Sequence, residues 1–190
     1  MADGVTTADQ RLLRIVASSF TLLRWQVALR QQTMQLYETH LPVKSTEAAL
    51  QFYVDVVQLQ FAYRDPTRDI VFLWIGSDRR SMLGLWGPST TYGGDYHKCH
   101  FAIAVTLPEL HGSAKRLVEM GVPCRNFQGE TTTEPSVIGW MPSAQIYFRD
   151  LDGHSVEFIA LLNEAPDAGF IGSLSDWEKK ARQSGTGARV

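Results

Sequence analysis

The sequence lacks several features that define large classes of proteins. It has only two cysteines, Cys99 and Cys124, among 190 residues, which is too few for a disulfide framework and does not match the spacing of a thiolate metal site. Two reduced thiols are typical of a cytoplasmic protein. The formal net charge is only −2 and the basic residues are scattered, so we expect neither nucleic acid nor a membrane as a partner.

Residues 1–33 contain no long uncharged apolar run. Arg14, Arg24 and Arg30 interrupt every apolar stretch, which argues against a membrane-spanning helix. The apolar residues recur at a rough helical spacing, so we expect an N-terminal extension that is helical and not catalytic. Two alternatives stay open: the segment is basic and poor in acids, as organelle-targeting segments are, or translation starts at Met34.

The rest of the chain repeats one order of elements. In a first module, residues 34–93, we predict a helix that begins after Ser45 as its N-cap. The strands predicted in this module are 36–43, 60–64, 70–76 and 81–86. In a second module, residues 94–164, we predict a helix over 108–120 that ends at Gly121. Its predicted strands are 99–105, 122–127, 144–148 and 155–161, with a turn at Asp152-Gly153 before the last.

The two halves therefore each read as βαβββ. Val43 and Val105 occupy equivalent positions, and Glu38 and His100 each lie five residues earlier. We predict an α+β fold in which the two tandem modules form a curved mixed sheet around a central cleft, with the helices on its outer face. Residues 165–190 are expected to form a C-terminal helix and a flexible tail.

Three stretches carry a resemblance to a known family. They are ETHLPV followed by STEAALQFY in the first half, HFAIAV in the second, and FRDLDGHSVEF near the end. With these motifs the chain resembles the vicinal oxygen chelate superfamily, which includes glyoxalase I, bleomycin-resistance proteins and extradiol dioxygenases. The resemblance implies a metal cleft, a small-molecule substrate and a homodimer, and it is less specific for the reaction than for the fold.

Carried over residue by residue, the resemblance implies a three-ligand metal site of Glu38, His100 and Glu157. The fourth family position falls near Gly84 and offers no ligand. Two carboxylates and one imidazole suit a single divalent ion such as Mn²⁺, Fe²⁺, Ni²⁺, Zn²⁺ or Mg²⁺. Three ligands leave positions open for substrate. Glu38 or Glu157 is also a candidate catalytic base.

His40 is an alternative to Glu38. It follows Glu38 by two residues, so both side chains leave the same face of the strand. We therefore keep His40 as a possible ligand or as an acid or base. His154 lies an odd number of residues before Glu157, so we expect it to face away from the cleft and to be structural.

Aromatic residues on or near the predicted strands are candidates for substrate contact. Those selected are Trp74, Trp86, Phe101 and Trp140. They favour a partly apolar substrate. The sequence shows no obvious cluster of Arg and Lys near the predicted ligands, which argues against an anionic substrate.

These observations favour a metal-dependent enzyme of the lyase or isomerase type that acts on a small oxygenated substrate. Two alternatives stay open. One is an extradiol-type dioxygenase, and the other is a metal-free protein that binds a drug or metabolite.

Overall fold

The structure, a computed structural model, describes residues 35–183. The helix predicted within residues 1–33 and the end of the predicted tail lie outside the described residues. Within the described part of the chain, no helix is both long enough and apolar enough to cross a membrane.

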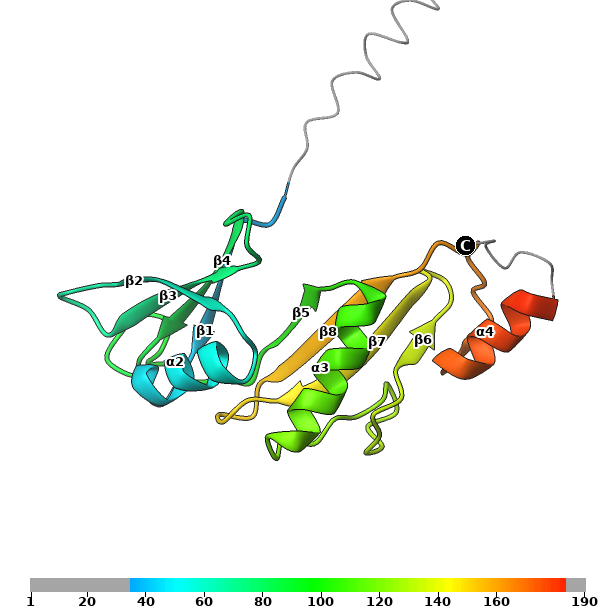
Figure 1. Cartoon of the computed structure of the whole chain (residues 1–190). Coiled ribbons are helices and arrows are strands. Elements are labelled where there is room, and N and C mark those ends of the chain that lie inside the picture. The colour runs from blue at the N-terminus through cyan, green and yellow to red at the C-terminus, as the bar shows by residue number, and fades with distance from the viewer. Residues whose placement is uncertain (1–34, 184–190) are drawn as a thin grey trace, which may run out of the picture. The chain divides into compact units, whose positions relative to one another are not determined.

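The first module forms a four-stranded sheet with one helix (Figure 1). Its elements are β1 (Glu38–Pro42), α2 (Thr46–Asp55), β2 (Gln60–Arg64), β3 (Ile70–Ile75) and β4 (Ser81–Trp86). The strand order is β1-β4-β3-β2, in which β1 pairs with β4 in parallel and the other pairs are antiparallel. Ser45 is the N-cap of α2, as predicted, and its side chain accepts a hydrogen bond from the Ala48 N–H.

The second module repeats this arrangement and extends it by one strand. Its elements are β5 (His100–Ala104), α3 (Leu107–Glu119), β6 (Ser136–Ile138), β7 (Ser143–Arg149), β8 (Ser155–Leu161), β9 (Ile171–Ser173) and α4 (Leu174–Gln183). The strand order is β5-β8-β7-β6-β9, again with one parallel pair, β5 with β8. The α+β fold and the βαβββ repeat are thus confirmed, and each module has its own hydrogen-bonded sheet.

One predicted strand is wrong. Residues 122–127 form only two isolated bridges, both at Arg125, which pairs with Tyr147 and with Thr131. Pro123 has no N–H to donate to a ladder, which explains why pairing does not extend along this segment. The strand that neighbours β7 is instead the short β6, and the C-terminal segment adds β9 to its other edge.

The core of each module lies between its helix and one face of its sheet. Alternate residues of β1, β3 and β4, such as Leu41, Leu73 and Leu85, are buried together with Phe52 of α2. In Figure 1, α3 lies across β8 and β7, and it contacts both strands. Because side chains alternate along a strand, the other face of each sheet is left for polar and aromatic residues.

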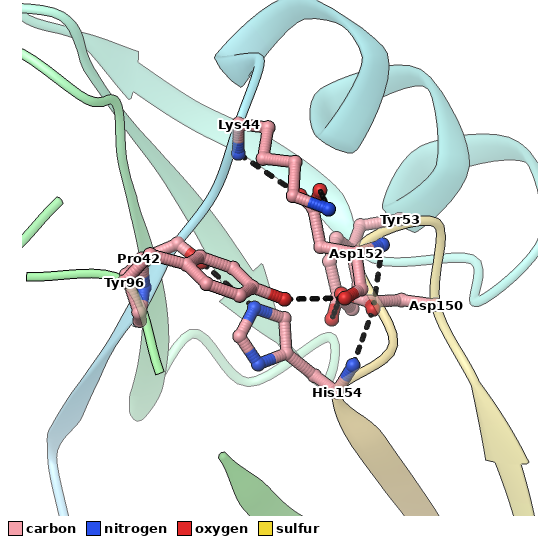
Figure 2. A network of polar contacts seen from close by, with 7 residues as sticks. All are labelled: Pro42, Lys44, Tyr53, Tyr96, Asp150, Asp152 and His154. Atoms are coloured by element: carbon pink, nitrogen blue, oxygen red, sulfur yellow. Dashed lines mark hydrogen bonds and ion pairs between the residues drawn. The ribbon is translucent and has the colours of Figure 1, made fainter. Parts of the chain in front are cut away.

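A buried polar network joins the modules (Figure 2). The Tyr53 hydroxyl on α2 donates to Asp150 Oδ2 at 2.8 Å, and the His154 N–H donates to Asp150 Oδ1 at 2.8 Å. His154 Nδ1 accepts from the Cys99 N–H at 3.0 Å, so its Nε2–H donates to the Pro42 carbonyl at 2.7 Å. His154 is completely buried, which agrees with its predicted structural role.

Candidate functional site

The second module contributes the pair of His100 and Glu157 to the candidate site. His100 Nε2 lies 3.1 Å from Glu157 Oε2, and His100 Nδ1 lies 3.2 Å from the Ser155 carbonyl oxygen. A carbonyl oxygen can only accept, so Nδ1 carries a proton in this contact, and Nε2 faces the Glu157 carboxyl group. This second contact orients an imidazole for metal binding in the way that many protein metal sites do.

Glu157 combines burial with a close contact to His100. The residue is only 6% exposed, whereas the His100 side chain is 52% exposed. Burial raises the pKa of Glu157, and His100 and Tyr147 act in the opposite direction. Burial and the negative charge of Glu157 also raise the pKa of Tyr147 to about 12, so its hydroxyl keeps its proton at neutral pH.

Strand register shows which side chains share the face of the sheet with this pair. One row across β5, β8 and β7 contains His100, Ser155 and Arg149. The next row on the same face contains Ala102, Glu157 and Tyr147, and the bridge to Tyr147 adds Arg125. This face is therefore polar and contains two arginines beside the predicted ligand pair.

The first module places Glu38 and His40 together on β1. Glu38 Oε1 and His40 Nε2 are in direct contact, and both side chains are partly exposed. His40 pairs with Gly84 of β4. A β carbon on Gly84 would lie 2.8 Å from His40 Cδ2, so the imidazole occupies the space that a side chain at Gly84 would need.

The register of the two modules identifies equivalent residues. Glu157 pairs with Ala102, and His100 lies two residues before Ala102 on β5. Gly84 pairs with His40, and Glu38 lies two residues before His40 on β1. Gly84 is therefore the counterpart of Glu157, and Glu38 is the counterpart of His100, as the repeat in the sequence predicts.

The structure does not bring all three predicted metal ligands together. It places His100 beside Glu157, whereas Glu38 contacts His40 on the other module. Within residues 35–183, no three His, Cys, Asp or Glu side chains form a group that could hold a metal ion. Each module thus presents a pair of potential ligands, and neither pair is a complete site by itself.

The aromatic residues predicted to contact substrate separate into different environments. Trp74 and Trp86 lie on the same face of the first sheet as Glu38 and His40, and the Trp86 ring lies 4.7 Å from the His40 ring. Phe101 points to the opposite face from His100 and packs against the core, because neighbouring residues of a strand alternate. Trp140 is 63% exposed in the turn before β7.

The expectation that no cluster of Arg and Lys lies near the predicted ligands is corrected by the structure, which places two arginines beside His100. Arg125 and Arg149 line the same hollow as His100, together with Tyr147 and Phe127. They lie 25 and 49 residues after His100 in the sequence, so no local motif reveals the cluster. The hairpin turn at Asp152-Gly153 fixes the pairing of Arg149 with Ser155 and of Tyr147 with Glu157. Because this turn is visible in the sequence, it could have predicted the positions of Arg149 and Tyr147.

Solved structures share the fold over most of their length. An integron cassette protein from the mobile metagenome of the Halifax Harbour sewage outfall is 28% identical, with a TM-score of 0.54, over 67% of this chain and 98% of that one. A lactoylglutathione lyase from Agrobacterium tumefaciens is 23% identical (TM-score 0.52; 68% and 96%). The oxidase ChaP-H2 is 16% identical (TM-score 0.54; 73% and 100%). No curated protein sequence matches the chain significantly.

The sequence also matches a family model over most of the part that forms the two modules. The match covers residues 34–158, which include β1 with Glu38, β5 with His100, and β8 as far as Phe158. It agrees with the repeated βαβββ order and with the shared fold of the solved structures. The chain therefore belongs to the glyoxalase/bleomycin resistance protein/dioxygenase superfamily.

Proposed function

We propose that this protein is a metal-dependent enzyme of the lyase or isomerase type that acts on a small, oxygenated and partly apolar substrate. The observation that supports this most is the contact of His100 Nε2 with the buried Glu157, while His100 Nδ1 faces the Ser155 carbonyl. This arrangement places an imidazole nitrogen and a carboxylate beside one point. Such a pair has the donor chemistry of a divalent metal site.

We further propose that the third ligand comes from a second copy of the chain. Glu38 is the repeat counterpart of His100, but it does not approach the His100–Glu157 pair within one chain. Glu38 lies on β1 and His100 lies on β5, and each of these strands is at the edge of its sheet. In a two-fold symmetric dimer, Glu38 and His40 of one copy would face His100 and Glu157 of the other. The symmetry would create this combined site twice.

The chemistry of the completed site follows from its residues. When bound, the metal would polarise two neighbouring oxygens of the substrate. His100, Glu157 and Glu38 would hold it, and His40 would lie beside Glu38 as a group able to accept or donate a proton. Trp74 and Phe72 on the same face would provide an apolar surface for the rest of the substrate.

Metal uptake tests the first part of the proposal. Protein purified without chelator is analysed for metal, and the apoprotein is titrated with Mn²⁺, Zn²⁺ and Ni²⁺. Glu157→Gln keeps the size of the side chain but removes its charge, and it should lower the affinity at least about tenfold. Glu119→Gln, an exposed carboxylate on α3, is the matched control and should bind as the wild type does. Stoichiometric metal in Glu157→Gln would contradict the proposal.

A mixing experiment tests the second part. The double variant Glu38→Ala/His40→Ala and the variant Glu157→Gln should each lose the metal. Heterodimers of the two would contain one intact site, because one chain supplies Glu38 and the other supplies His100 and Glu157. Co-refolded mixtures should therefore recover about a quarter of the wild-type metal content. No recovery in a mixture that forms dimers would contradict a site shared between chains.

A further inference from the structure

The hollow beside His100 has a chemical character that the proposed metal centre does not explain. Its volume is about 370 Å³, and its walls include Arg125, Arg149, Phe127 and Tyr147. None of the residues that line it is an Asp or Glu. A metal centre needs only its ligands, so two cationic side chains here call for a separate explanation.

Arg125 and Arg149 lie on the same face of the sheet and line the same hollow. Arg125 pairs with Tyr147, with backbone N–H···O distances of 2.8 and 2.9 Å, and Arg149 lies two residues beyond Tyr147 on β7. Diagonal neighbours of this kind have Cα atoms about 7–8 Å apart. Two side chains as long as arginine can therefore contact a single small group between them.

The positive charges of these two arginines are not neutralised by the contacts that they make within the described chain. The Arg149 Nη1 donates to the Gly153 carbonyl at 3.1 Å, which holds the side chain but does not neutralise it. The Arg125 guanidinium makes no hydrogen bond or ion pair with another residue of the described chain. The nearby Glu130 accepts from Asn126 at 2.8 Å, and Glu157 faces His100.

We propose that Arg125 and Arg149 bind a negatively charged oxygen group, a carboxylate or a phosphate, at one end of the substrate. Guanidinium groups match both anions with two parallel hydrogen bonds. The inference rests on the proposed function only in taking this hollow as part of the substrate site. Arg149 lies two strands from His100, or about 10 Å, which leaves room for about one aromatic ring between an anion at Arg149 and an oxygen held at His100.

The aromatic residues that line the hollow are consistent with a substrate of this length. Phe127 is 49% exposed, and Tyr147 lies 6.0 Å from His100 between ring centroids. Tyr147 pairs with Arg125 on one side and with Glu157 on the other, so it lies between that arginine and the predicted ligand, and Phe127 lines the same hollow. The substrate class is thus an anion with a flat or apolar middle and a pair of oxygens at the far end.

The test measures binding of simple probes to the full-length protein in the presence of EDTA, so that its outcome does not depend on a metal. The probes are phenylacetate and phenyl phosphate, with phenylacetamide as the neutral analogue, and binding is followed by calorimetry or by NMR. We expect at least one anion to bind about tenfold more tightly than the amide, and the tighter one identifies the anionic group. Equal binding of the amide and both anions, or no binding of any probe, would overturn the proposal.

Variants locate the interaction. Arg125→Gln and Arg149→Gln should each weaken binding of the preferred anion by about tenfold or more, because a hydrogen bond to a charged group contributes this much. Arg182→Gln on α4, which removes an exposed arginine outside the hollow, should have no effect. Equal losses in all three variants would indicate unspecific charge attraction and overturn the proposal.

The two proposals can fail separately. If Arg125→Gln and Arg149→Gln keep the wild-type metal affinity but lose the anion, the anion site is real and distinct from the metal ligands. If the metal experiments fail while the EDTA-treated wild type still binds the anion, the hollow is a binding site without metal chemistry. Anion binding that persists in both arginine variants would overturn the inference whatever the metal result.

Discussion

The network around Asp150 should contribute strongly to stability, and its contribution can be worked out from the structure. Asp150 is 8% exposed and accepts three hydrogen bonds, from the Tyr53 hydroxyl and from the N–H groups of His154 and Asp152. Asp150→Ala leaves the Tyr53 hydroxyl and the His154 N–H buried without a partner, whereas the Asp152 N–H lies near solvent. Each buried orphan costs about 1–3 kcal/mol. We therefore expect the free energy of unfolding to fall by about 2–6 kcal/mol.

The companion variant Tyr53→Phe isolates one of these bonds. It removes the hydroxyl but leaves Asp150 with its two backbone donors, so we expect a loss of about 1–2 kcal/mol. In the Tyr53→Phe background, Asp150→Ala no longer leaves a buried hydroxyl unpaired and should cost about 1–3 kcal/mol less than in the wild type.

Urea unfolding followed by circular dichroism and by tryptophan fluorescence measures all four free energies. Asp78→Ala is the control, because Asp78 is an exposed partner of Arg80 and should change stability by less than about 0.5 kcal/mol. An Asp150→Ala variant that is no more destabilising than Asp78→Ala would refute a strong contribution from the network. Simple additivity of the two network substitutions would refute the coupling between Tyr53 and Asp150.

Burial, and next the Asp150 charge, raise the pKa of Tyr53 well above its ordinary value of 10.0. Its contribution to stability is therefore complete below pH 10 and falls by about 1.4 kcal/mol per pH unit as the pH rises from there toward the folded-state pKa. Urea midpoints between pH 9 and 11.5 should decline more steeply for wild type than for Tyr53→Phe, and parallel curves would be evidence against this. Gly84→Ala should destabilise the protein by about 1–3 kcal/mol and shift the NMR signals of His40, because the new β carbon would lie 2.8 Å from the imidazole. The same substitution at Gly112 in α3, where nothing lies within 4 Å, should instead stabilise by about 0.5–1 kcal/mol; the reverse order would show that the imidazole moves freely.

Local sequence signals were sufficient for most of the fold. The Ser45 cap, the helical spacing after it and the alternation in 81–86 depend on neighbouring residues, and the elements were found within a residue or two. The strand predicted at 122–127 failed because β propensity was given more weight than the missing donor of Pro123. Pairing between distant segments, such as Arg125 with Tyr147, depends on the tertiary fold and leaves no local pattern.

For the candidate site, too, some features could be predicted from the sequence and others could not. The equivalence of Glu38 and His100 could be predicted because it depends on counting along two copies of one motif. Their separation within the chain could not, because it depends on how the two modules are joined. The prediction that Phe101 contacts substrate conflicts with strand alternation, because Phe101 directly follows His100 and therefore lies on the other face of the sheet.

The hydrogen bond from His154 to Pro42 has a consequence beyond stability. Pro42 ends β1, the strand that contains Glu38 and His40, and His154 immediately precedes β8, the strand that contains Glu157. One imidazole therefore ties together the two strands that carry the halves of the site. In a dimer built as proposed, each chain would connect two metal centres, and the His154 ring would lie on the path between them. A displacement at one centre would then be transmitted to the other through the buried contacts between the modules, of which the His154 ring is one.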